Sequence, residues 1–166
     1  MIRANELRKT YGQVPVVDRL SFEARPGEVL AALLFHDAIY DPTRSDNEAR
    51  SAALARETLR GAQPESLDRI ARAIEATRTH VAAGADEALV LDVDLSILGA
   101  EPDVYDAFER AIRAEYAHVP GDAFAMGRRA VLEGFAKRAR IYVTPDFHDA
   151  LDARARENLG RALAQW

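Results

Sequence analysis

The sequence predicts an all-α domain preceded by a short extended arm. From Glu28 onward, apolar residues recur at helical spacing almost to the end of the chain. Prolines and glycines divide this region into segments of helical length. Before Pro26, in contrast, residues 11–25 (YGQVPVVDRLSFEAR) partly alternate and are rich in valine, which favours strands or an extended arm.

The composition is typical of one soluble globular domain. The chain has 166 residues, of which 48% are hydrophobic and 30% charged, and this length is short for two ordinary domains. We therefore expect an N-terminal arm at residues 1–27 and a helical domain at 28–166. No run of apolar residues is long enough to span a bilayer, and the N-terminus has no secretory signal, so the expected compartment is the cytoplasm.

Charge and cysteine content narrow the possible chemistry. A net charge of -5 argues against nucleic acid as the main partner, whereas a small phosphorylated ligand stays open. The chain has no cysteine, which excludes disulfides and thiol nucleophiles. Any metal must therefore be held by His, Asp or Glu. The oligomeric state is left open.

The first two helices have recognisable boundaries. An apolar helix is expected from Glu28 to Tyr40, where Asp41-Pro42 ends it. Ser45 and Glu48 fit a capping box that opens a second helix, which stops at Gly61.

Five more helices follow, and prolines suit the first position of three of them. They are expected at residues 64–80, 86–98, 102–116, 122–135 and 145–163. Seven helices joined by short turns predict an all-α fold.

The His36-Asp37 pair interrupts the apolar run at 33–35 and is the strongest chemical signal in the chain. An imidazole beside a carboxylate forms half of a binding site for a divalent cation. Such a cation can generate a nucleophile from bound water near neutral pH. The pair thus indicates a reaction class without naming a substrate.

Asp92 and Asp94 are the candidates for the distal half of that site. Two residues apart on a helix, their side chains differ in direction by roughly 200°, so only one is expected to meet His36. Asp94 shares its face with leucines, where an unpaired charge would be very costly. Asp94 is therefore the predicted ligand and Asp92 the fallback, and the alternative is a hydrogen-bonded core acid.

The remaining polar residues carry weaker signals. His80 ends a helix, where a cationic imidazole suits the helix dipole about as well as a metal or catalytic role would. An acid of the 46–48 cluster could instead orient the imidazole of His36. Residues expected at the surface or at helix ends, some of which could bind phosphate, are Arg44, Arg50, Arg78, His118, Lys137 and His148.

The opening of the chain resembles the start of an ABC transporter ATPase subunit. The order LRKTYG, VVDRLSF, RPGEVLA is similar to that family's approach to its phosphate loop, with Tyr11 where the family stacks adenine. No GxxxxGK[ST] loop occurs anywhere in the chain, so neither ATP binding nor ATP hydrolysis is expected.

Residues 29–160 resemble a small bacterial family of predicted metal-dependent HD-superfamily phosphohydrolases. The similar blocks are FHDAIYDPTRSDNEARSAALA, IEATRTH, LDVDLSILG, IRAEYAHVP and IYVTPDFHDALDARARENL. The resemblance implies an all-helical HD domain whose metal is held by an upstream histidine, by the His36-Asp37 doublet and by a distal acid. That acid is Asp94, with Asp92 as the fallback, and His80 matches a histidine that serves a second metal or the reacting phosphate.

One departure from the family bears on function. The upstream histidine should precede the doublet, but residues 1–35 contain none. The implied activity is metal-dependent hydrolysis of a nucleotide or another small phosphate ester, with Mn, Mg or Fe bound and with Asp37 and His80 in catalytic roles. The alternative is a helical module that keeps the HD scaffold and binds its partner without turnover.

Overall fold

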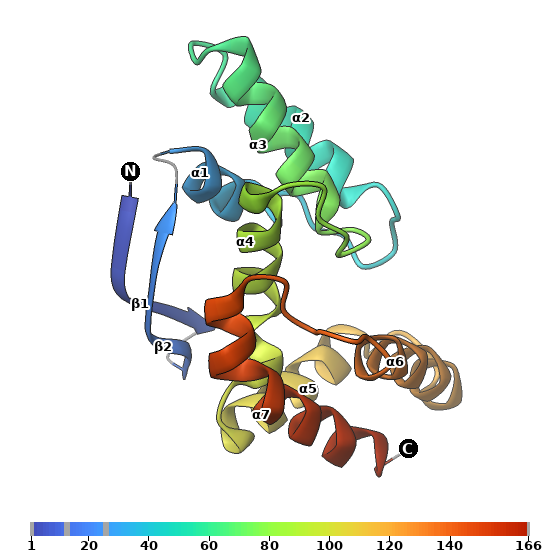
Figure 1. Ribbon diagram of the computed structural model, residues 1–166. Helices are drawn as coiled ribbons and strands as arrows, with labels where there is room; N and C mark the ends of the chain where they lie inside the picture. The colour runs from blue at the N-terminus through green and yellow to red at the C-terminus, as the bar shows by residue number, and fades with distance from the viewer. Residues whose placement is uncertain (1, 12–13, 25–26, 166) are drawn as a thin grey trace. The chain divides into compact units, whose positions relative to one another are not determined.

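The computed structural model describes the backbone of residues 2–11, 14–24 and 27–165, and the side chains of residues 27–165. This part of the chain contains seven α-helices, one 3-10 helix and two paired strands (Figure 1). The prediction of an all-α fold is confirmed for the chain from Glu28 onward. The side chain of Tyr11 and the turn predicted at Pro26 lie outside the described residues.

The strands β1 (Ile2–Tyr11) and β2 (Val14–Ala24) are hydrogen-bonded neighbours in a two-stranded sheet. A link of two residues joins adjacent strands only when they are antiparallel, so the pair is a hairpin. The sequence predicts extended structure for the second strand. The first is harder to foresee, because charged residues interrupt its apolar positions.

The chain divides into two compact units. Residues 1–5 and 21–94 form the first, and residues 6–20 and 95–166 form the second. The first unit therefore contains α1–α4, and the second contains the 3-10 helix η1 and α5–α7. The division falls between Asp94 and Leu95, inside the segment for which the sequence predicts one continuous helix.

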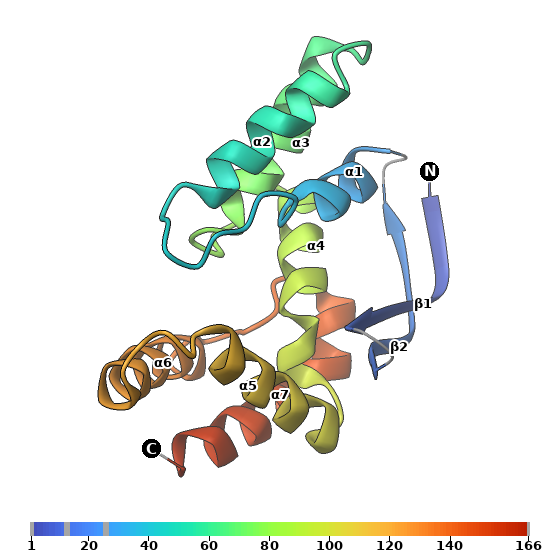
Figure 2. The ribbon, with the colours of Figure 1, turned by 180° about the vertical axis from the view of Figure 1, so that it is seen from behind.

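The first unit is built from α1 (Glu28–Phe35), α2 (Asn47–Thr58), α3 (Pro64–Ala76) and α4 (Ala85–Asp94). The pair α2 and α3 lies side by side in both ribbon views, and α1 packs against α2, α3 and α4 (Figures 1 and 2). The core is apolar and includes Val29, Ala32, Ala52, Ala55, Ile70, Ala71, Ile74 and Val90. This packing fixes the end of α1, where the His36-Asp37 pair lies.

The start of α2 differs from the prediction. Asp46 is its N-cap and no side chain caps it, so the expected capping box of Ser45 and Glu48 is wrong. The helix begins at Asn47, one residue later than the capping box requires, and the carboxylate of Asp46 is paired with Arg44 at 2.6 and 2.7 Å. Asn47 holds the preceding loop, since its amide donates to the carbonyl of Asp41 at 2.8 Å.

The second unit contains η1 (Leu95–Gly99), α5 (Pro102–Glu115), α6 (Gly121–Ala136) and α7 (Pro145–Leu163). In it α7 packs against η1 and α6, and α5 packs against η1. As predicted, prolines occupy the first turn of α3, α5 and α7. The predicted helix at 86–98 is α-helical only to Asp94 and then narrows to a 3-10 helix.

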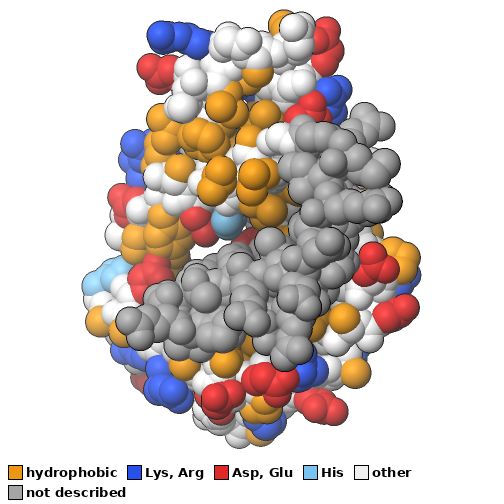
Figure 3. Space-filling view, turned by 90° about the vertical axis from the view of Figure 1, so that its left-hand side faces the viewer, with side chains coloured by type: hydrophobic (Ala, Val, Ile, Leu, Met, Phe, Trp, Pro, Cys, Tyr) orange, Lys and Arg blue, Asp and Glu red, His pale blue; other side chains and the backbone are white. Residues whose placement is uncertain are grey.

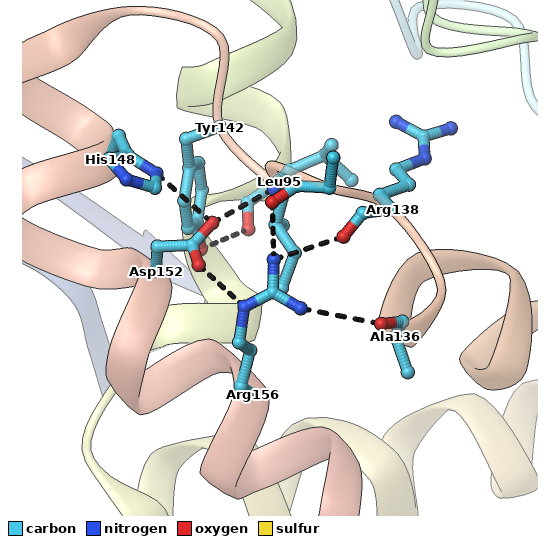
Figure 4. A network of polar contacts seen from close by, with 9 residues as sticks. Leu95, Ala136, Arg138, Tyr142, His148, Asp152 and Arg156 are labelled. Carbon is cyan, nitrogen blue, oxygen red and sulfur yellow. Dashed lines mark hydrogen bonds and ion pairs between the residues drawn. The ribbon is translucent and has the colours of Figure 1, made fainter.

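A polar network centred on Arg156 closes the C-terminal end of α6 (Figure 4). Its guanidinium donates to the carbonyls of Ala136, Arg138 and Ala139 at 3.0 to 3.3 Å, and to the Asp152 carboxylate at 2.7 Å. The other oxygen of Asp152 accepts from the backbone N–H of Ile141 at 2.8 Å. These bonds satisfy carbonyls that a helix end leaves without partners.

Side chains of α7 also donate hydrogen bonds to the carbonyl groups at the end of η1. Asn158, which is fully buried, donates to the carbonyls of Leu98 and Ala100 at 2.8 and 2.9 Å. Arg154 donates to the carbonyl of Gly99 at 2.6 Å. The tight 3-10 turn is thus stabilised by donors from the helix that packs on it.

Replacing Asp152 with asparagine should lower the free energy of unfolding by about 1–3 kcal/mol at neutral pH, because the charge-assisted bond to Arg156 is lost. Burial raises the pKa of Asp152, but the Ile141 N–H and Arg156 outweigh it and lower that pKa overall. Such a carboxylate stabilises the fold above its unfolded pKa of about 3.9, and the contribution disappears as the pH falls through the folded value.

The loss in free energy of unfolding caused by Asp152→Asn, measured by urea unfolding, should therefore be largest above about pH 5 and become smaller below about pH 4. Asp149→Asn removes the same charge from an exposed position of α7 and is the control. A deficit of equal size at both pH values would contradict the assigned role of the carboxylate.

Gly99→Ala should destabilise the protein by about 1–3 kcal/mol through overpacking. A Cβ at this position would lie 2.7 Å from the Cβ of Leu151 and 2.9 Å from the hydroxyl of Tyr142. The matched control is Gly160→Ala, where an added Cβ meets nothing within 4 Å. Thermal unfolding of both variants checks the prediction, and equal midpoints would refute it.

Candidate functional site

The first unit brings four of the predicted site residues together. Nε2 of His36 lies 3.2 Å from a carboxylate oxygen of Asp37 and 3.3 Å from one of Asp94. The other oxygen of Asp94 lies 3.5 Å from Nε2 of His80. Three separate elements supply these side chains: the end of α1, the end of α4 and the turn after α3.

His36 is held in a defined orientation at the end of α1. It is the C-cap of that helix and is buried. Its Nδ1 lies 2.8 Å from the carbonyl oxygen of Leu33. A carbonyl only accepts, so Nδ1 carries a proton and donates it. Nε2 is therefore the nitrogen that faces the carboxylates, and among the described residues nothing else hydrogen-bonds to it.

The two carboxylates dominate the electrostatics of His36. Burial by itself would lower the pKa of this imidazole, because it disfavours the charged form. The contacts with Asp37 and Asp94 outweigh burial and raise the pKa of His36 to about 10. The group at the centre of this cluster is thus a cation held by two acids.

The position of Asp94 follows from the way α4 ends. It is the last α-helical residue before η1, and its side chain is 17% exposed. Asp92, the fallback ligand, is completely buried and has an interaction partner of its own. Asp92 is enclosed because α4 is buried on every side from Ala88 to Val93.

His80 has an unusual backbone. Its φ of 53° lies in the left-handed region, and its N–H donates to the carbonyl of Ala76 at 2.8 Å. Helices commonly end on a residue of this conformation, but that residue is usually glycine or asparagine. A histidine there is strained, and such strain clusters at functional sites. The sequence gives one weak sign of this left-handed residue: no glycine follows the helix before Gly84, so another residue type must end the helix.

The other predicted residues lie apart from this cluster. His118 is exposed and stacks on Tyr116, with ring centroids 5.9 Å apart. His148 belongs to the Arg156 network, where its Nδ1 lies 3.3 Å from Asp152. Arg44 is paired with Asp46. The carbonyl of Leu33, and not an acid of the 46–48 cluster, holds the imidazole of His36.

Two exposed apolar residues lie close in sequence to the residues of the cluster. Leu34, two residues before His36, is 70% exposed, and Val81, directly after His80, is 69% exposed. Figure 3 shows apolar side chains gathered on one face of the molecule beside a histidine and acidic side chains.

The donor set fits a divalent cation in its chemistry. A metal-bound histidine typically donates its second ring N–H to a carbonyl, as His36 does to Leu33. Neighbouring ligand atoms around a cation such as Mg²⁺ lie about 3 Å apart, close to the separations found here. Within residues 27–165, however, no three His, Asp or Glu side chains are arranged as a metal-binding site. In the present arrangement the carboxylates contact the imidazole itself.

The second unit contains a separate cavity of about 330 Å³. None of the predicted site residues lines it; its walls include Tyr105, Glu109, Arg110 and Arg113 of α5 and Ala162 and Gln165 near the C-terminus.

Comparisons with known proteins give no match. No protein-family model, no curated protein and no solved structure is similar to the chain. No helix in the described residues has the length and apolar character that crossing a membrane requires. The resemblance to the HD superfamily therefore stays a prediction.

His80→Gly should be more stable than His80→Ala by about 1 kcal/mol. Both changes remove the imidazole, but only glycine adopts the left-handed backbone without a steric cost. Urea unfolding of the two variants measures the difference. An alanine variant at least as stable as the glycine variant would show that the backbone at this position is unstrained.

Proposed function

We propose that this protein is a metal-dependent phosphohydrolase with an HD-like helical scaffold, acting on a nucleotide or another small phosphate ester. The observation that carries the proposal is the convergence of His36, Asp37, Asp94 and His80 from three elements of the first unit. These four residues are spread along the chain from position 36 to position 94, and the fold brings a polar atom of each within 3.5 Å of another.

Three of these side chains would hold the cation: His36 through Nε2, and Asp37 and Asp94 through their carboxylates. A bound divalent cation of the Mn, Mg or Fe type supplies Lewis acidity and lowers the pKa of a bound water. Leu33 keeps Nδ1 of His36 protonated, which directs Nε2 towards the cation.

Asp37 and His80 are placed for proton handling. The side chain of Asp37 is 59% exposed and that of His80 is 23% exposed, so both reach solvent at the edge of the cluster. Asp94 lies 3.5 Å from His80 and orients its imidazole. His80 would give a proton to the leaving oxygen of the ester, and Asp37 would take one from the attacking water.

The absent upstream histidine has a candidate replacement within the cluster. All four histidines of the chain lie at or after position 36, and His80 is the second imidazole that reaches Asp94. Its strained backbone is consistent with a position selected for the reach of the side chain.

His36→Ala and Asp94→Asn should each abolish metal binding and lower phosphatase activity by at least about 100-fold, since a lost ligand removes both the cation and its activated water. The measurements are elemental analysis after loading with Mn²⁺ or Mg²⁺ and release of phosphate from nucleoside monophosphates. His118→Ala, at an exposed position outside the cluster, is the matched control and should behave as the parent. A parent protein that cannot be loaded with either metal would sink the proposal.

The second candidate function is a binding module on the same scaffold. It is favoured by the direct contact of both carboxylates with the imidazole of His36, which neutralises the acids without a metal. In that case nucleoside monophosphates should bind the parent in calorimetry without turnover, and added Mn²⁺ should leave the affinity unchanged.

A further inference from the structure

Helix α6 has an apolar face that the described residues of its own unit leave exposed. The helix packs on α7 and buries Phe124 and Leu132. Away from that buried side, Met126 is 75% exposed and Val131 is 47% exposed. The small residues between them are exposed too, and the complete face is Ala123, Met126, Gly127, Ala130, Val131 and Gly134. In both ribbon views α6 lies at the edge of the unit (Figures 1 and 2).

The glycines on this face pack against nothing within residues 27–165. Gly127 and Gly134 lie inside a helix, where glycine is less stable than alanine. A Cβ at either position would meet nothing within 4 Å, so packing in the unit does not require their small size. Small residues on a helix face allow another helix to approach at the short end of the usual interaxial distance.

The face is symmetric along the helix. The positions 123, 127, 130 and 134 are spaced by four, three and four residues, and their midpoint lies between Arg128 and Arg129. Reversing the helix about that midpoint exchanges Ala123 with Gly134, Gly127 with Ala130, and Met126 with Val131. An antiparallel pair of identical helices related by a two-fold axis makes these same exchanges. Every residue of the face would therefore meet an apolar or small residue of the second copy.

The charges at the two ends are complementary in the same arrangement. Asp122 lies in the first turn of α6, and Lys137, which is exposed, follows its last turn. Antiparallel packing brings Asp122 of one copy near Lys137 of the other. Arg129 and Lys137 both pair with Glu133 of their own helix at 2.9 Å, so these three side chains together keep one positive charge for Asp122 of the second copy. Antiparallel helices also place opposite ends of their dipoles together.

We infer that two copies of this chain associate through α6, packed antiparallel about a two-fold axis between Arg128 and Arg129. A helix of 16 residues is about 24 Å long, and one such pair buries less than the roughly 1,200 Å² of a standard stable interface. The association is therefore weak and concentration-dependent. It uses no residue of the proposed metal site.

The absence of cysteine from the chain permits a clean geometric test. Ala123→Cys and Gly134→Cys are made as separate proteins of different tag length and treated with diamide. Antiparallel packing places the two positions opposite each other, within the short distance that a disulfide needs. The mixture should give the mixed covalent dimer, in excess over either self-linked product. Self-linked Ala123→Cys as the main product would indicate parallel packing and overturn the inference.

Sedimentation velocity of the full chain, from about 10 to about 500 µM, tests the association itself. The parent should sediment faster as its concentration rises. Gly127→Leu should weaken the association at least about tenfold, because its side chain blocks the close approach. Gly160→Leu is the matched control in α7, also exposed and with nothing within 4 Å of an added Cβ, and should behave as the parent. Circular dichroism verifies that both variants are folded. A parent that stays monomeric throughout, or equal behaviour of the two leucine variants, would overturn the inference.

Discussion

The carbonyl groups at helix ends need donors, and this requirement organises the structure. In the second unit, Arg156 donates to a carbonyl at the end of α6, while Asn158 and Arg154 donate to carbonyls of η1. In the first unit, the hydroxyl of Thr77 donates to the carbonyl of Ile74 at the end of α3. His36 belongs to the same group, since its Nδ1 donates to the last turn of α1. The bond that ends α1 is therefore also the bond that directs the reactive nitrogen of His36.

A structural cap thereby becomes a feature of the candidate site. Once Nδ1 is committed to Leu33, Nε2 can interact only with Asp37, Asp94 or a ligand. Two carboxylates close together repel each other unless a cation lies between them. The protonated imidazole provides that charge here, and a divalent cation would provide it in the proposed enzyme. Either way, the end of α4 is tied to the end of α1 by electrostatics.

Sequence patterns were sufficient for the helices but not for all of their ends. Helical periodicity and N-terminal prolines gave the seven helices, because both signals are local. The capping box at Ser45 was wrong, because α2 begins one residue later, with Asp46 as its N-cap. The complete burial of Asp92 could not be predicted from residue spacing, since α4 is buried on every side from Ala88 to Val93. Neither the left-handed backbone of His80 nor the Arg156 network follows from residue spacing, because both depend on contacts made in three dimensions.

Arg156 has a consequence for the dynamics of the second unit. Its single guanidinium reaches the end of α6, the segment after it and, through Asp152, the N–H of Ile141. None of these segments can separate from α7 without breaking bonds to the same group. They should therefore open together as one cooperative unit in hydrogen exchange, with the hydrogen-bonded amides of Lys137, Arg138 and Ile141 as slow as their neighbours in α7. A stretch without regular secondary structure would then be among the slowly exchanging parts of the chain.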